Sequence, residues 1–557
     1  MNRNTESRFS LNPTNLEISR SRFDRSSVVK TSFNVGDLIP FYVDEVLPGD
    51  TFSVKTSKVV RMPALKTPIM DNVFLDTYYF FVPCRLIWEH WNEFMGENTE
   101  SEWIPTVEYE IPQIQAPEDG WEVGTIADYF GIPTGVGNIK VNALPFRAYA
   151  LICNEWFRDQ NLMKPLVINR GDSLAIGSNG NNYIVDCQLG GRPFVAAKYH
   201  DYFTSALPAP QKGPDVTIPI ADAGNLPVVP LDERIDPALL THDYTVKGGS
   251  TTECSWMGGP NADRTMNFIR GGSAGSGGKK WWIDNLWAIN DGEALSATIN
   301  QLRLAFQIQR LYEKDARGGT RYIELIKSHF GVTAPDYRLQ RPEYLGGNRI
   351  PITINQVVQQ SSTDENSPQG TVAGMSLTTD VNGDFTKSFT EHGYIIGLMV
   401  ARYQHTYQQG LNRLWSRKDR FDFYFPVLAN IGEQAIYNRE IYLQEDTEVN
   451  PVSGKPYNDE VFGYQEAWAE YRYKPSIVTG QMRSEYDQSL DIWHLADDYE
   501  EMPKLSAEWI KEDKSNLDRV IAVTSELAHQ LFADIYVINR TTRPMPMYSI
   551  PGLIDHH

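Results

Sequence analysis

Short runs in which apolar and polar positions alternate dominate the N-terminal part of the chain. Such alternation places successive side chains on opposite faces of an extended strand, so it predicts β-strands. Turn-forming residues such as those of Leu47–Asp50 separate the runs. Strands at this spacing indicate a sandwich or a barrel. The predicted strands are Ser27–Val35, Leu38–Val46, Thr51–Arg61 and Asn72–Val82.

The last of these runs differs from the others because both of its faces are apolar. We therefore expect an interior strand that is covered on both sides, and we expect Pro83 to end it because proline cannot donate to a sheet ladder. Residues at helical spacing follow, and Gly96 closes this short helix. The two strand faces carry Val73, Leu75, Thr77, Tyr79 and Phe81, and Phe74, Asp76, Tyr78, Phe80 and Val82; the helical residues are Ile87, Trp91 and Phe94.

Comparable strand patterns return only late in the chain. If one sandwich uses both sets, strands near the N-terminus pair with strands near the C-terminus, as in the double Greek key of a jelly roll. We therefore expect a mainly β protein whose body is an antiparallel β-sandwich of the jelly-roll type. The later predicted strands are Arg349–Val358, Arg420–Pro426, Tyr471–Val478 and Ala533–Arg543.

Two segments between the strand sets have helical periodicity. Asn290–Lys314 carries apolar stripes on two opposite sides, and Arg321–Phe330 is a shorter helix ended by Gly331. A helix with two apolar stripes is expected to lie between neighbours, so we expect both helices to pack on the body. The stripes are Leu295, Ile299, Leu302 and Phe306, and Leu304, Ile308 and Leu311.

Residues 206–280 lack the pattern of a sandwich. Ala206–Pro230 contains six prolines, and Lys247–Lys279 contains nine glycines. A loop region of this length is usually functional or disordered, so we expect one Pro/Gly-rich surface insertion. The expected organisation is a basic N-terminal arm at 1–30, a jelly-roll body with helical insertions at 31–205 and 281–557, and the insertion at 206–280.

The charge of the chain is unevenly distributed. Its 557 residues carry a net charge of −20, which argues against a protein that coats duplex nucleic acid with its whole surface. Residues 1–30 instead carry six cations against three acids. This segment is either a poorly ordered terminus or an arm that lies on phosphates, whose geometry suits arginine. The candidate DNA-facing residues are Arg3, Arg8, Arg20, Arg22, Arg25 and Lys30.

Cysteine usage and the N-terminus favour a reducing cytoplasm. The four cysteines lie tens of residues apart without a Cys-x-x-Cys pair, which favours free thiols. The N-terminal residues lack the apolar core of a signal peptide. The most apolar run, Tyr394–Val400, is far shorter than the roughly 20 residues that span a bilayer. We therefore expect no membrane insertion.

Motifs for catalysis or metal binding do not meet their structural requirements. Gly271–Gly275 has the Gly-x-Ser-x-Gly spacing of a hydrolase, but the Ser-Gly-Gly-Lys-Lys that follows cannot open a helix. The acidic segment Asp491–Asp513 lacks the pattern of a calcium loop and indicates a solvated face. The ten histidines are scattered. We therefore expect a protein that is not an enzyme, with no catalytic residues, no metal site and no cofactor.

Short segments spread over nearly the whole chain carry a family likeness. They are Phe81–Gly96, Tyr199–Gln211, Trp287–Asn290 running into Leu302–Gln307, Ala316–Tyr322, Glu343–Gly347, Glu391–Gly397 and Arg543–Asp555. In this order they resemble the major capsid protein of the Microviridae, small single-stranded DNA bacteriophages, and in particular the gokushovirus branch. Each segment alone is a weak signal, but the ordered set is specific.

The resemblance implies a single viral jelly roll, an eight-stranded antiparallel β-sandwich with long helical and loop insertions. This protein would assemble into a T=1 icosahedral shell around a circular single-stranded DNA genome. Residues 206–280 would correspond to the family's variable loop, a protrusion at the three-fold axes proposed to meet a bacterial host surface receptor. Implied partners are an internal scaffolding protein, a DNA pilot protein and a small basic DNA-binding protein. The protein would be part of the virion after assembly in the host bacterial cytoplasm. The candidate host-contact residues are Trp256, Met257, Arg264, Phe268 and Arg270.

Two other function classes remain open from the residues alone. A carbohydrate-binding or carbohydrate-active β-sandwich protein would explain the abundant Trp and Tyr, and the acid pairs Asp497-Asp498 and Glu500-Glu501. A nucleic-acid-binding protein that works alone is opposed by the net charge of −20. The first alternative predicts a monomer or small oligomer, whereas a capsid protein predicts large closed particles.

Overall fold

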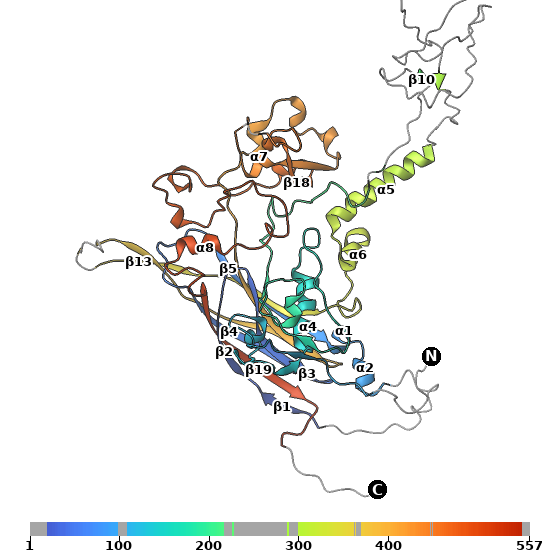
Figure 1. The fold of residues 1–557 in the computed structure, drawn as a ribbon, viewed down its shortest axis with the longest axis vertical. Helices are drawn as coiled ribbons and strands as arrows, with labels where there is room; N and C mark the ends of the chain where they lie inside the picture. Colours follow the sequence, from blue (N-terminus) through green and yellow to red (C-terminus); the bar gives the residue numbers. More distant parts are fainter. Residues whose placement is uncertain are drawn as a thin grey trace, which may run out of the picture. The chain divides into compact units, whose positions relative to one another are not determined.

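The computed structural model describes residues 19–97, 108–214, 216, 226–227, 287–288, 299–360, 363, 369–445, 447 and 449–548 (Figure 1). The chain divides into a body, formed by Met1–Gly213 with Tyr312–His557, and a second unit, Pro214–Leu311. Within the second unit, the described elements are the antiparallel strands β10 (Leu226–Pro227) and β11 (Trp287–Ala288) and the first part of α5 (Ile299–Gly318).

The body is built around a sandwich of two antiparallel sheets (Figure 1). The first sheet orders β2 (Ser27–Phe33), β19 (Leu531–Arg543), β4 (Thr51–Arg61) and β15 (Thr378–Ser388), and β1 (Ser21–Asp24) continues the β2 edge along β19. The second orders β12 (Glu343–Pro351), β5 (Val73–Pro83), β16 (Gly393–Tyr403) and β3 (Asp37–Val46), and the two-residue strand β9 (Phe194–Val195) pairs with the start of β3. These two orders confirm the predicted eight-stranded jelly roll, in which N-terminal strands pair with C-terminal ones.

Two apolar clusters lie on either side of the β5 sheet. Between the sheets, inward residues such as Phe52, Leu75 and Ile535 form one buried cluster, because alternate residues of each strand point inward. On the other side, Phe80 and Phe146 belong to a second cluster, to which α1 (Cys84–Ile87) and α4 (Leu144–Ile152) contribute. β5 is therefore buried on both faces, as its sequence predicted, and Pro83 is its last residue.

Smaller elements extend this body. α2 (Trp91–Phe94) is a separate turn after α1, so the predicted short helix is two helical turns. β13 (Ile354–Val358) and β14 (Val372–Ser376) form a hairpin between β12 and β15. β17 (Glu433–Tyr437) and β18 (Val461–Glu466) form another antiparallel pair beside a third buried cluster. The remaining elements are β6 (Gln113–Gln115), α3 (Ile126–Tyr129), β7 (Lys140–Asn142), β8 (Ala175–Ile176), α6 (Tyr322–Phe330), α7 (Asn438–Ile441) and α8 (Ser515–Val520).

The predicted end of the basic arm, at residue 30, lies too late in the sequence. β1 and β2 both pair with β19, so residues 21–33 belong to the sandwich. The backbone N–H of Arg25, between the two strands, donates to Asn539 O at 2.8 Å. Side-chain burial alternates along β1, and β2 ends in the fully buried Phe33, so this polar segment still has an inward-facing side. An arm can include at most the residues before Ser21.

The boundaries of the insertion also differ from the expectation. Ala206 is buried in the third cluster, and Leu207 exchanges backbone hydrogen bonds with Tyr464 at 2.7 and 2.8 Å. These residues belong to the body, and the separate unit begins at Pro214 and ends at Leu311. Proline content alone does not distinguish an extended segment paired with the body from a segment that leaves it.

Two predicted late strands are wrong, and two strands of the sandwich itself were missed. Arg420–Pro426 forms 3-10 turns, because the Asp422 carboxylate accepts two backbone N–H groups and closes a turn. Tyr471–Val478 forms only an isolated bridge. The missed strands are β15, which has few apolar residues, and β16, whose continuous apolar run is typical of a fully buried strand.

The helices are exposed more than their apolar stripes predict. α6 begins and ends as expected, and Gly331 follows it with a left-handed φ of +70°. Leu304 and Phe306 on α5, and Tyr322 and Phe330 on α6, are nevertheless exposed. The prediction that both helices are covered by neighbours is therefore not met within the described part of one chain.

Asp76 is the one charged residue on the two faces of β5, and it is fully buried. Its carboxylate accepts hydrogen bonds from Arg349 Nε at 2.7 Å, Arg402 Nη2 at 2.5 Å and Tyr199 Oη at 2.9 Å. Burial alone would raise the pKa of Asp76, but the hydrogen bond from Arg349 and the charge of Arg402 hold it below its usual value. One carboxylate thus ties β12, β16 and the Tyr199 loop to the central strand.

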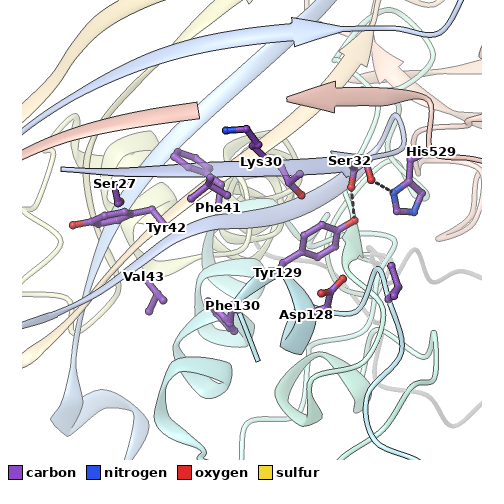
Figure 2. A pocket seen from close by; sticks show the side chains of 14 residues that line it. Ser27, Lys30, Ser32, Phe41, Tyr42, Val43, Asp128, Tyr129, Phe130 and His529 are labelled. Carbon is purple, nitrogen blue, oxygen red and sulfur yellow. Dashed lines mark hydrogen bonds between the residues drawn. The ribbon is translucent and has the colours of Figure 1, made fainter. Parts of the chain in front are cut away.

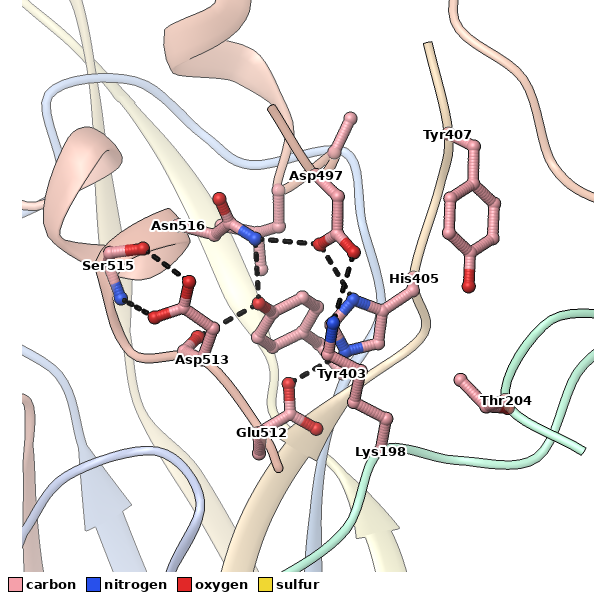
Figure 3. A network of polar contacts seen from close by, with 12 residues as sticks. Lys198, Thr204, Tyr403, His405, Tyr407, Asp497, Glu512, Asp513, Ser515 and Asn516 are labelled. Atoms are coloured by element: carbon pink, nitrogen blue, oxygen red, sulfur yellow. Dashed lines mark hydrogen bonds and ion pairs between the residues drawn. The ribbon is translucent and has the colours of Figure 1, made fainter. Parts of the chain in front are cut away.

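A second buried network fastens the C-terminal loops to the end of β16 (Figure 3). His405 Nδ1 lies 2.8 Å from Asp497 Oδ1, and its Nε2 lies 2.8 Å from Glu512 Oε1. Lys198 Nζ lies 3.2 Å from the other oxygen of Asp497. Because both ring nitrogens face carboxylates, both carry a proton and donate a hydrogen bond, and the imidazole is positively charged. Asp497, expected on a solvated acidic face, is therefore a buried member of an ion-pair network.

The carboxylates control the titration of this histidine. Burial lowers the pKa of His405, but the charges of Asp497 and Glu512 outweigh burial and raise the pKa to about 9. The effect is mutual: burial would raise the pKa of Asp497, but His405 and Lys198 hold it well below its usual range. Two cations and two anions balance, which limits the free-energy cost of burying them.

The raised pKa of His405 predicts a pH-dependent stability. Because the folded-state pKa of about 9 exceeds the unfolded value of 6.5, this contribution is complete below pH 6.5 and is lost as the pH rises through 9. We expect His405→Gln to lower the free energy of unfolding of the isolated chain by about 3 kcal/mol at pH 6, and by clearly less at pH 9.5, in urea titrations. His200→Gln, at an exposed position, is the control. An equal loss at both pH values would contradict the assignment.

Candidate nucleic-acid interface

The outward face of the sheet β2–β19–β4–β15 is basic, although the chain as a whole is acidic. Along β19, buried residues alternate with exposed ones, and β1, β2 and β4 place their outward residues beside these. Five cations and two acids share this face, against a net charge of −20 for the chain. We call this the basic sheet face; its charged members are Arg22, Lys30, Lys55, Arg61, Arg540, Asp24 and Asp534.

The strand register sets the neighbours of these charges. Lys30 lies opposite Asp534 on β19, and their side chains form a weak exposed pair at 3.5 Å. Arg540 lies opposite Asp24, whose carboxylate also accepts from the backbone N–H of Ser26 at 3.1 Å. Lys55 and Arg61, in contrast, have Ile538 and Phe532 opposite them. The positive charges of β4 therefore have no acidic residue opposite them on β19.

Aromatic rings lie among these cations. Phe532 and Tyr536 are 42% and 43% exposed and point outward from the same strand. They lie four positions apart along the strand, or about 13 Å. Surfaces that bind single strands without reading sequence combine basic side chains for the phosphates with aromatic rings on which bases stack. The basic sheet face has both parts.

The structure divides the predicted DNA-facing residues. Arg22 and Lys30 lie on the basic sheet face. Arg20 donates to the backbone oxygen of Gly49, and Arg25 forms a two-pronged pair with Asp44 at 2.7 and 2.8 Å. These two guanidinium groups bind the protein itself. Arg3 and Arg8 lie outside the described residues.

Sequence reasoning missed the greater part of this face. Lys55 and Arg61 lie in a predicted strand, and Phe532, Tyr536 and Arg540 lie in or beside another. The alternation with apolar residues is visible in the sequence and predicts that all of these side chains point outward. What it could not show is that the two strands are neighbours, which brings the separate cations onto one surface.

A cleft of about 460 Å³ opens between the edge strands β2 and β3 of the two sheets (Figure 2). Ser32 Oγ lies 2.8 Å from His529 Nδ1, and Tyr129 Oη donates to Ser32 O at 2.9 Å. A nucleophilic serine would need an acid that orients the histidine. The nearby Asp128 carboxylate instead accepts the backbone N–H of Gly124 at 2.8 Å. These contacts join the segment before β19 to β2 and assemble no catalytic triad.

The other site predictions have mixed outcomes. Cys84, Cys153 and Cys187 are buried free thiols, as expected, and Cys254 lies outside the described residues. Among the described side chains, no cluster of His, Cys, Asp and Glu could hold a metal ion. The candidate host-contact residues all lie outside the described part: Trp256, Met257, Arg264, Phe268 and Arg270.

Comparison with known proteins identifies the family. A sequence model described as "Capsid protein (F protein)" matches residues 12–553. The chain belongs to this capsid protein family. It is 43% identical to capsid protein VP1 of Spiroplasma virus 4, with 96% of each chain covered. It is also 42% identical to the VP1 proteins of Chlamydia phage 1, with 98% of each chain covered, and of Bdellovibrio phage phiMH2K, with 96% and 95% covered.

Membership in the capsid protein family confirms the resemblance noted in the sequence. The match spans residues 12–553 and so includes every strand of both sheets. The chain is a structural protein of the virion. No helix within the described residues is long and apolar enough to cross a bilayer.

The basic sheet face of this capsid protein predicts a measurable affinity for single strands. We expect the triple variant Arg22→Gln, Arg61→Gln, Arg540→Gln to bind an oligo-dT more weakly in fluorescence anisotropy titrations. The slope of log K against log salt should fall by about 2, because each lost phosphate contact on a single strand contributes about 0.7. Arg25→Gln is the matched control, since the Arg25 guanidinium already forms an ion pair with Asp44. Equal slopes for the triple variant and the unaltered subunit would exclude the basic sheet face as the surface that binds single-stranded DNA.

Proposed function

We propose that this chain is the major shell subunit of a T=1 icosahedral capsid that encloses a circular single-stranded DNA genome. The observation that carries the proposal is the capsid family match over residues 12–553. Closed symmetry repeats the same contacts in every subunit, so individually modest interfaces suffice. In this arrangement the basic sheet face lies toward the genome, and the acidic remainder of the chain lies elsewhere on the particle.

The proposed assembly involves further proteins. An internal scaffolding protein, a DNA pilot protein and a small basic DNA-binding protein would act with the subunit in the host bacterial cytoplasm. The charge of the chain supports a separate basic protein, because a subunit with a net charge of −20 cannot neutralise packaged DNA by itself.

The second unit is the proposed site of host attachment. Pro214–Leu311 forms a unit of its own, which supports an insertion that the sandwich does not require. It contains the five candidate host-contact residues, which combine aromatic and cationic side chains suited to hot spots of binding.

The shell proposal predicts large particles rather than a small oligomer. Native protein from infected cells should sediment as one fast peak that carries nucleic acid absorbance, and electron microscopy of that peak should show uniform icosahedral particles. Purified subunits alone are the control for spontaneous assembly. Only a slow, nucleic-acid-free species, with all phage partners present, would contradict the proposal.

The attachment proposal predicts that the insertion affects infection more than folding. Replacing Pro214–Lys279 with a short flexible linker should leave a folded subunit, as judged by circular dichroism and thermal unfolding, but should reduce infectivity. Trp256→Ser with Phe268→Ser keeps the chain length and should show the same loss. Normal infectivity of both variants would reject host contact, and a misfolded deletion variant would assign the segment to the core.

A further inference from the structure

Lys58 occupies an inward position of β4, between the two sheets of the sandwich. Its neighbours on the same face of the strand, Thr56 and Val60, are buried as well, and the Lys58 side chain has no exposed surface. Lysine is rarely buried in this way, because taking an ammonium group out of water costs free energy. Burial accordingly lowers the pKa of Lys58, and the contact with Asp380 offsets this only in part. The lowered pKa favours the uncharged amine, which is a nucleophile.

The strand register brings three polar side chains to the Lys58 amine. Within the first sheet, Asp380 of β15 lies directly opposite Lys58. Within the second sheet, Asn348 of β12 lies directly opposite Thr77 of β5. These two cross-strand pairs meet across the sandwich, because Lys58 Nζ lies 2.5 Å from Asn348 Oδ1 and 3.2 Å from Thr77 Oγ1. The four side chains therefore come from four strands and from both sheets.

The side-chain amide of Asn348 is held at both of its ends. Its Oδ1 accepts hydrogen bonds from Thr77 Oγ1 at 2.8 Å and from Lys58 Nζ at 2.5 Å. Its Nδ2 donates to Asp380 Oδ2 at 2.8 Å. Because a C=O bond is about 1.2 Å long, the lysine nitrogen lies within about 3.7 Å of Asn348 Cγ. Atoms that are positioned to react lie about 3–3.5 Å apart, so the amine is close to reacting distance from the amide carbon.

Asp380 is placed to move the proton that such a reaction transfers. Its Oδ2 lies 3.2 Å from Lys58 Nζ and 2.8 Å from Asn348 Nδ2. A carboxylate in this position can take a proton from the attacking amine and deliver it to the amide nitrogen. Thr77 Oγ1 donates to the oxygen on which negative charge would develop, as in an oxyanion hole. An ion pair would need only Lys58 and Asp380, whereas these contacts also supply an acceptor carbon and an oxyanion donor.

We propose that Lys58 and Asn348 form an intramolecular isopeptide bond that joins β4 to β12. The uncharged Lys58 amine attacks Asn348 Cγ, and Asp380 carries one of the amine protons to Nδ2. The Cγ–Nδ2 bond breaks, ammonia leaves, and a Cγ–Nζ amide takes its place. One amide bond breaks and one forms, so the step requires no oxidant, cofactor or activated co-substrate. The bond closes a covalent loop between residues 290 positions apart and fastens the two sheets to each other.

Mass spectrometry of the unaltered, full-length protein tests the proposal without any variant. The tryptic digest should contain one species that joins residues 56–61 to residues 339–349, because trypsin cleaves neither after a modified Lys58 nor between Arg341 and Pro342. The mass of this species should be lower than the sum of the two peptides by one ammonia. Recovery of the two segments only as separate peptides would overturn the inference. A loss of ammonia confined to residues 339–349, as in a succinimide at Asn348, would overturn it too.

A matched pair of aspartate variants on β15 tests the role of Asp380. Asp380→Asn keeps the size of the side chain but removes the proton carrier, so the joined species should decrease at least about tenfold. Asp384→Asn is the control and should retain the joined species, because that carboxylate instead accepts from Asn382 Nδ2 at 3.1 Å and from Thr56 Oγ1. Circular dichroism should show that both variants are folded. Unchanged joining in Asp380→Asn, or equal loss in the two variants, would overturn the assignment of Asp380 as the proton carrier.

Discussion

The pairing of the C-terminal strand β19 with β2 and β4 is the contact on which the rest of the fold depends. It completes the first sheet and joins segments that lie almost the whole chain apart, as the 3.1 Å hydrogen bond from Val35 N to Gln530 Oε1 illustrates. The entropic cost of closing a loop grows only with the logarithm of its length. Once the sandwich closes, long insertions between its strands therefore add little further cost, and the chain can carry a separate unit between its two strand sets.

Buried charge networks then fix the loops to this sandwich. Asp76 holds two arginines from neighbouring strands, and His405 holds two carboxylates from the C-terminal loops. Lys58, between the sheets, pairs with Asp380 at 3.2 Å. Each network draws its members from segments far apart in sequence. Removing one member leaves a buried charge without its partner, which is strongly destabilising. The intact networks add little net stability, because burying their charges costs free energy, and they mainly specify the arrangement of the loops.

The two faces of the first sheet show how one pattern serves two purposes. The alternation that buries Ile535 also turns Tyr536 outward, and the strands beside it turn their cations to the same side. A core and a candidate genome-facing surface therefore arise from the same strands.

The sequence by itself determined the early strands, the doubly buried β5, the short helix α6 and the capsid family, because these depend on local periodicity or on ordered segments. It did not determine where the arm ends or which late segments are strands. Asp422 and Pro426 turn an apolar run into 3-10 turns, and β1 becomes a strand only because β19 offers an edge. The basic sheet face was decided by tertiary structure alone, since its cations lie on strands that meet only when the two ends of the chain pair.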